Sequence, residues 1–161
     1  MAVQSGVYRG VSAQERAAER RERLLEATLG VWADPEVSTT MTNVCARAGL
    51  SERYFYESFA NLDAAQTAVL DQVATEIETR TQEAGDLAGP DPAARALASV
   101  SAFVQLLVDD PRKGRVAIVE AAAMPSLRPR RTELMRHFAH RTAESARELG
   151  LSPLGGPEDE L

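Results

Sequence analysis

The side chains best suited to bind another molecule lie in one stretch, residues 39–59, which reads TTMTNVCARAGLSERYFYESF. Within it Arg53 and Glu57 are four residues apart, so on a helix they would project from one face. A guanidinium can donate to O6 and N7 of guanine, and a carboxylate can accept from N4 of cytosine. Arg53 and Glu57 are therefore candidates for hydrogen bonds to base edges in the major groove of DNA.

Five other polar side chains of this stretch are further candidates for DNA contacts. Thr39 or Thr40, at the start of a helix, can donate to a phosphate beside free backbone N–H groups. Tyr54 could contact a thymine methyl group or a phosphate, although Tyr54 and Tyr56 could instead be packing aromatic residues. Ser51 is better suited to cap a helix than to contact a base.

The elements that would position these side chains are two short helices, over residues 40–47 and 52–59. Gly49 between them can adopt the left-handed conformation that ends a helix at little cost. Phe55 and Phe59 fall on the face of the second helix opposite the polar side chains, so we expect them to be buried. Two short helices with a glycine turn and an exposed polar face are typical of a DNA-reading helix-turn-helix.

This stretch resembles the DNA-binding segment of the tetracycline-repressor (TetR) family of bacterial transcription regulators. Residues 23–32 are similar to the first helix of that family, and residues 61–73 to the start of its long fourth helix. The sequence departs from the family at Leu62, where a lysine near a DNA phosphate is usual. The matching residues are, in order, Thr40, Met41, Val44, Cys45, Ala48, Gly49, Leu50, Ser51, Phe55, Tyr56 and Phe59.

The resemblance implies an all-α fold with a helix-turn-helix DNA-binding domain over residues 1–60 and a helical regulatory domain over residues 61–161. It implies a repressor that a small-molecule effector releases from its double-stranded operator, and a phosphate contact for Tyr56. Family members usually continue into two helices that pair in a homodimer, and this sequence stops where they would begin. We therefore expect either a truncated chain, whose complete form is a homodimer, or another mode of dimerisation.

The apolar residues of the second half are candidates either for the wall of an effector pocket or for an ordinary helical core. A methionine side chain suits both, because it adapts to irregular surfaces. The resemblance favours a pocket somewhere in this region. The candidate ligand-binding residues are Phe103, Leu107, Met124, Met135 and Phe138.

Helix-start signals divide the rest of the chain. A capping box formed by Ser12 and Glu15 predicts the start of the first helix, and Asp91 followed by Pro92 predicts another. The glycines and prolines of residues 85–92 mark a break after the fourth helix. Further helices are expected from near Asn61, Asp110 and Ser126, the one from Asp110 running through an alanine-rich segment and the last ending at Gly150. Residues 1–11 are expected to form an arm and residues 151–161 a loop.

The composition limits the class of protein. The chain has 161 residues, a net charge of −6 and no apolar run of the roughly 20 residues that span a bilayer. Without a secretion signal it is predicted to be cytoplasmic, and one cysteine cannot form an intrachain disulfide. Residues 1–60 hold 7 Arg or Lys against 8 Asp or Glu, and residues 61–161 hold 11 against 16. The arginines of the first helix could contact phosphates or form a solvated face.

Three alternatives compete with DNA binding. An enzyme is disfavoured because no paired acid–base group stands out, and Cys45 is expected to pack in the core rather than act as a nucleophile. His137 and His140 have a spacing that can hold a metal, but no third ligand supports it, so no metal or cofactor is expected. The main alternative is a helical protein-interaction module that has the same fold and has lost DNA binding.

Overall fold

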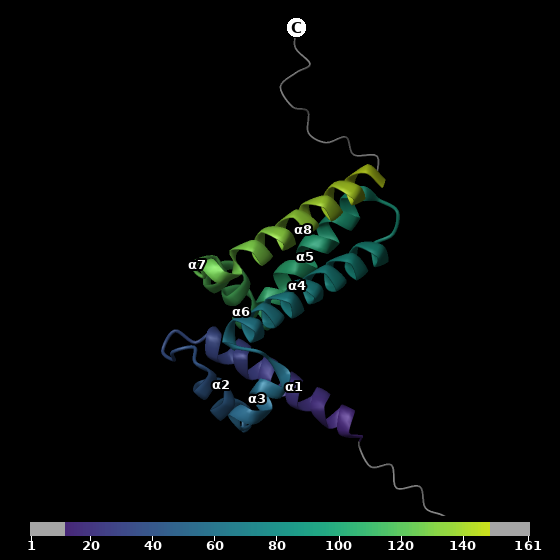
Figure 1. Cartoon of the computed structure of the whole chain (residues 1–161). Helices are drawn as coiled ribbons and strands as arrows, with labels where there is room; N and C mark the ends of the chain where they lie inside the picture. The colour runs from purple at the N-terminus through teal and green to yellow at the C-terminus, as the bar shows by residue number, and fades with distance from the viewer. Residues whose placement is uncertain (1–11, 149–161) are drawn as a thin grey trace, which may run out of the picture.

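In the computed structural model, which describes residues 12–148, the chain forms helices joined by turns, with no strand among these residues (Figure 1). The expected all-α fold is confirmed. The predictions made for the N-terminal arm, for Gly150 and for the C-terminal loop fall outside these residues. No helix in the described range is long and apolar enough to cross a membrane.

The first three helices form a compact N-terminal unit: α1 (Ala13–Trp32), α2 (Met41–Ala48) and α3 (Glu52–Ser58). The predicted capping box starts α1, because the backbone N–H of Glu15 donates to the Ser12 hydroxyl and the N–H of Ser12 donates to the Glu15 carboxylate. The C-terminal half of α1 is almost wholly buried, so this helix is the support on which α2 and α3 rest.

The long helix α4 (Leu62–Leu87) starts at Asn61, whose side chain accepts from the backbone N–H of Ala64 at 2.8 Å. It ends two residues later than the expected Gly85. α5 (Pro92–Asp109) returns antiparallel along it, as Figure 1 shows, with the Ser99 hydroxyl donating to the carbonyl oxygen of Thr81. Its start is the predicted one, because the Asp91 carboxylate caps the first turn and Pro92 opens it.

The single helix expected from Asp110 is in fact three consecutive pieces, α6 (Pro111–Gly114), the π-helix η1 (Arg115–Glu120) and α7 (Ala121–Ala123). In a π-helix residues five apart lie above one another. Val116 and Ala121 are five apart and both buried, and Arg115 pairs with Glu120 at 2.9 Å. The wider turn of the π-helix therefore places both apolar residues in the core. The period of an α-helix does not predict that two residues five apart are buried together.

The last elements are the 3₁₀-helix η2 (Pro125–Leu127) and α8 (Arg128–Glu148), which begins two residues after the expected Ser126. One hydrophobic cluster extends from Leu24 in α1 through Val69 in α4 to Val116 and Leu127. The N-terminal unit and the remaining helices therefore share a core across the expected domain boundary at residue 60.

The outer face of α5 is not part of this core. Only Leu106 of this helix is buried. The other side of the helix carries a stripe of large apolar side chains that are between 52 and 69% exposed, and no charged residue lies between Arg95 and Asp109. The stripe consists of Leu97, Val100, Val104 and Val108.

Candidate nucleic-acid interface

The turn between α2 and α3 has the predicted geometry. Gly49 has φ 62° and ψ 38°, which is the left-handed conformation, and its backbone N–H donates to the carbonyl oxygen of Ala46. The Thr40 hydroxyl caps α2 by accepting from the N–H of Asn43 at 3.2 Å. Ser51 occupies the N-cap position of α3, but its side chain makes no capping hydrogen bond. The turn therefore owes its shape to Gly49 rather than to a serine cap.

α3 has the two different faces expected of it. Phe55 is fully buried and its ring lies 5.6 Å from that of Phe59, the residue that follows the helix. On the opposite side the Arg53 side chain is 85% exposed and Tyr56 is 59% exposed. Tyr54 is also exposed, so the candidate side chains of α3 are accessible to a partner.

The three remaining candidates outside α3 are wholly or partly accessible, whereas Glu57 of α3 already pairs with two arginines. Thr40 and Ser51 are exposed, and Thr39 is half-buried. Glu57 accepts from Nε of Arg53 at 3.1 Å through one carboxylate oxygen, while the other lies 3.8 Å from an Nη atom of Arg20. The expected hydrogen bond from Glu57 to cytosine would therefore have to compete with two guanidinium groups.

Three arginines of α1 contact α2 and α3 rather than standing free. The Arg20 guanidinium lies over the Tyr54 ring at 4.5 Å. Arg21 donates to the carbonyl oxygen of Ser58 at 2.7 Å and lies over the Phe59 ring, and Arg23 donates to the carbonyl oxygen of Ala48 at 2.5 Å. The sequence predicted only phosphate contacts or a solvated face for these arginines. Their observed contacts instead fasten α2 and α3 to α1.

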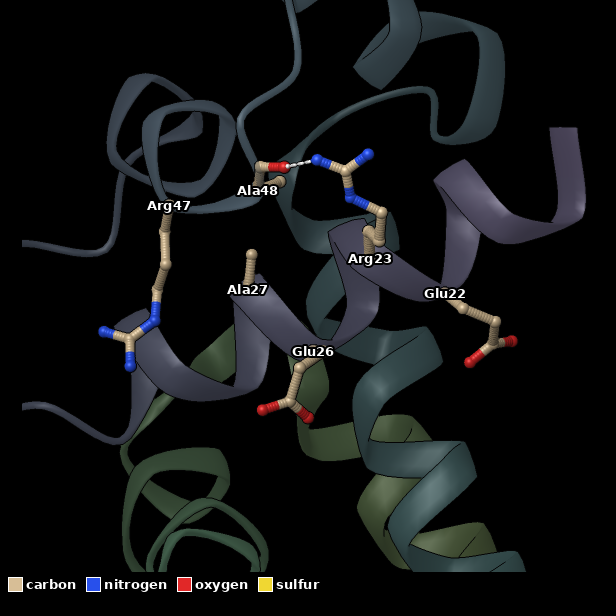
Figure 2. Close-up of a pocket in the computed structure, with 6 residues that line it drawn as sticks. All are labelled: Glu22, Arg23, Glu26, Ala27, Arg47 and Ala48. Atoms are coloured by element: carbon tan, nitrogen blue, oxygen red, sulfur yellow. Dashed lines mark hydrogen bonds between the residues drawn. The ribbon is translucent and has the colours of Figure 1, made fainter. Parts of the chain in front are cut away.

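A groove of about 560 Å³ lies between α1 and α2 (Figure 2). Arg23 and Arg47 border it, and so do the carboxylates of Glu22 and Glu26, so both signs of charge line it. Arg47 was missed as a surface feature by sequence reasoning. Arg47 lies against Gly30 of α1. A Cβ atom at Gly30 would come within 2.7 Å of Nε of Arg47, so the glycine at this position is the one sequence signal for the contact.

The five residues predicted to line an effector pocket are not gathered around either of the two grooves described for residues 12–148. A groove of about 330 Å³ between α4 and α8 includes Phe138 but not the other four. Phe103 and Leu107 are half-buried on α5, and the Met124 sulfur accepts from the Gln66 side chain at 3.4 Å. Met135 is exposed on α8.

The groove between α4 and α8 is bordered mainly by polar side chains that pair with one another. Arg130 of α8 contacts Asp71 of α4 at 2.7 Å. Nε2 of His137 lies 3.0 Å from the carboxylate of Glu78, which also pairs with Arg141. A ligand bound in this groove would therefore have to replace ion pairs between the two helices.

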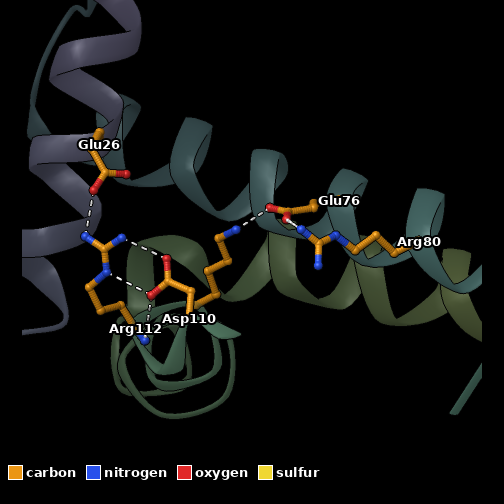
Figure 3. Close-up of polar contacts among 6 residues, drawn as sticks. Glu26, Glu76, Arg80, Asp110 and Arg112 are labelled. Carbon is orange, nitrogen blue, oxygen red and sulfur yellow. Dashed lines mark hydrogen bonds and ion pairs between the residues drawn. The ribbon is translucent and has the colours of Figure 1, made fainter. Parts of the chain in front are cut away.

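A cluster of ion pairs connects α1 and α4 to the start of α6 (Figure 3). The Arg112 guanidinium donates twice to Asp110, at 2.8 Å for each bond, and its third nitrogen donates to Glu26 of α1 at 2.6 Å. Lys113 donates to Glu76 of α4 at 2.6 Å. The hydrogen bonds from Arg112 hold the pKa of Asp110 below its usual range. We call these five residues the junction cluster.

The other candidate chemistry finds little support. Cys45 is buried, and burial raises the pKa of its thiol, which lowers the thiolate fraction needed for nucleophilic attack. His140 pairs with Glu144 of its own helix. No group of three or more metal-ligating residues was found between residues 12 and 148.

Comparison with known proteins does not identify a family for this chain. No protein-family model and no curated protein matches the chain.

Proposed function

We propose that the protein binds double-stranded DNA in a sequence-specific manner, with α3 as the reading helix. The observation that carries the proposal is the two-faced character of α3: Phe55 anchors it while Arg53 and Tyr56 stand exposed on its outer side, with Tyr54 partly covered by Arg20 of α1. The left-handed Gly49 sets the angle between α2 and α3. The resemblance of residues 39–59 to the DNA-binding segment of TetR regulators supports the same function.

The local charge at α3 is compatible with DNA, although the whole chain carries −6. Arg20 and Arg53 share the single carboxylate of Glu57, so this group of three carries a net charge of +1. Arg53 uses its Nε atom for Glu57, and its two terminal NH₂ groups remain as donors for O6 and N7 of guanine. In this proposal Tyr56 and Thr40 contact phosphates.

We further propose that the protein is a repressor controlled by a small-molecule effector. α4 begins at Asn61, directly after the N-terminal unit, and continues without a break to Leu87. A ligand can change DNA affinity only if it binds one arrangement of the reading helices better than another. In a homodimer on a palindromic operator the two α3 helices would have to lie about 34–36 Å apart, or a multiple of that. Movement of α4 would alter this spacing.

The proposal is tested by selecting bound sequences from random duplex DNA with the full chain and then titrating salt. A DNA reader enriches a sequence, and its log affinity falls by about 0.9 per log unit of salt for each phosphate neutralised. Arg53→Ala should cost about 1–3 kcal/mol on the selected sequence and relax one position of each half-site. Arg136→Ala, which removes an exposed arginine of α8, is the control and should change little.

Three outcomes separate the possibilities. Equal weakening of Arg53→Ala on every sequence would make Arg53 a phosphate contact and remove it from base reading. Failure to enrich any sequence, together with affinity that does not depend on salt, would contradict DNA binding altogether. An effector that releases DNA without changing the Tyr56–Tyr56 separation would contradict the movement of α4.

The second candidate function is a helical protein-interaction module. The exposed stripe of α5 favours it, because an uncharged apolar helix face of this kind is typical of interaction sites. In that case the DNA selection fails, and Val104→Asp, in the middle of the stripe, abolishes partner binding while Arg53→Ala leaves it unchanged.

A further inference from the structure

We propose that Arg20 of α1 is a positioning residue for DNA reading, which fixes Glu57 and Tyr54 so that Arg53 is held ready to contact a base. The inference rests on the proposed function and adds to it a residue outside α2 and α3. It also assigns Glu57 a different role, that of a link between two arginines rather than a reader of cytosine.

Arg20 of α1 lies against α3 and contacts two of its side chains. Its guanidinium lies 4.5 Å from the centre of the Tyr54 ring, within the range of a cation–π interaction, and one Nη atom lies 3.8 Å from Glu57. Its side chain is only 25% exposed. A single side chain of α1 therefore contacts two neighbouring positions on the reading helix.

Glu57 is shared between Arg53 and Arg20. One carboxylate oxygen accepts from Nε of Arg53, and the other faces Arg20. Without Arg20 the carboxylate would be restrained only by Arg53, a residue on the same helix whose own side chain is 85% exposed. Such exposed pairs hold a side chain weakly, because solvent competes for both groups. With Arg20 present, Glu57 is tied to α1 and in turn restrains Arg53.

The restraint on Arg53 should affect how tightly the protein binds DNA. A long side chain that is already restrained near its bound conformation loses less conformational entropy when it reaches its target. Arg20 should therefore raise affinity only where Arg53 finds its preferred base. A phosphate contact behaves differently: its loss weakens binding to all sequences about uniformly and lowers the salt slope by about 0.9.

The experiment compares the full chain with its Arg20→Met variant on the selected duplex and on a scrambled duplex of equal length, over a range of salt concentrations. Methionine keeps much of the length and apolar contact while removing the charge. Affinity for the selected duplex should fall about two- to tenfold, the range expected for the cost of ordering one long side chain on binding. Affinity for the scrambled duplex and the salt slope should stay unchanged. Arg136→Met is the control for loss of one positive charge.

A double-mutant cycle tests the route through Glu57. Glu57→Gln keeps the shape of the side chain and removes its charge, so it should reproduce the loss seen with Arg20→Met. The two changes together should cost no more than either alone, because they break the same chain of contacts. Additive losses would overturn the linkage.

The remaining outcomes are equally decisive. A salt slope reduced by about 0.9 with equal losses on both duplexes would make Arg20 a phosphate contact instead. Unchanged preference in a folded Arg20→Met variant would remove Arg20 from DNA reading while leaving the proposed function intact. If the unaltered chain shows no preference between the duplexes, the proposed function itself fails and this inference fails with it. A thermal melt of each variant ensures that lost binding is not lost folding.

Discussion

Replacing Gly49 by alanine perturbs the turn on which the orientation of α3 depends. The residue has φ 62°, and a left-handed conformation costs an alanine about 1–2 kcal/mol. The added Cβ would also lie 3.3 Å from an Nη atom of Arg23, so that side chain must shift. The same nitrogen donates to the carbonyl oxygen of Ala48, and weakening this bond adds about 1 kcal/mol. The expected total is about 2–3 kcal/mol of unfolding free energy.

The assay is urea unfolding followed by circular dichroism, together with a thermal melt. For a chain of this size the loss corresponds to a fall in melting temperature of about 4–12 °C. Gly89→Ala is the matched control, because Gly89 has φ 85° and no atom within 4 Å of a built Cβ. It should show the backbone cost alone. Gly49→Asn should lose less than Gly49→Ala, since asparagine tolerates the left-handed region.

A free energy of unfolding for Gly49→Ala within about 0.5 kcal/mol of that of the unaltered chain would refute this expectation, because ordinary surface changes fall in that range. The expectation is refuted in part if Gly49→Ala and Gly89→Ala lose the same amount, because the contribution assigned to Arg23 would then be absent.

Three further predictions follow from other parts of the molecule. Phe55→Ala should lower the unfolding free energy by about 3–5 kcal/mol in urea, because the ring is fully buried under α3. The pKa of Asp110 is lowered by Arg112, so its charged form stabilises the fold above about pH 4 and this contribution is lost as the pH falls through the folded pKa. Stability curves of the unaltered chain and Asp110→Asn should therefore be furthest apart near neutrality and converge in acid; parallel curves would contradict the pairing. Cys45 should react with iodoacetamide much more slowly in the native chain than in urea, because burial both covers the thiol and raises its pKa.

Features set by neighbouring residues could be predicted from the sequence. The capping box of Ser12, the helix start near Asn61 and the left-handed Gly49 each depend on a few adjacent residues, and all three are found. The burial of Phe55 and Phe59 could also be predicted, because their four-residue spacing assigns them to one face of a helix.

Features set by distant contacts could not be predicted in the same way. The arginines of α1 look alike along the sequence, and only the placement of α3 against α1 shows that Arg20 and Arg21 contact its aromatic residues. The stripe of α5 has the apolar spacing of a buried face, yet burial depends on what packs against it, which periodicity does not specify. The same limit applies to the candidate pocket residues. Met135 is an apolar residue of the kind found in protein cores, yet it is exposed.

The π-helix at Arg115–Glu120 has a consequence for how the length of this segment can change. A wide turn holds one residue more than an α-helical turn needs, so removing one residue restores the ordinary spacing without rotating the flanking pieces. Ile118 is exposed and lies between the buried Val116 and Ala121. Its deletion would leave those two residues four apart, still on one face of a continuous helix. This is a place in the chain where a single-codon deletion should be tolerated, whereas the same deletion in the middle of α4 would turn half of that helix away from the core.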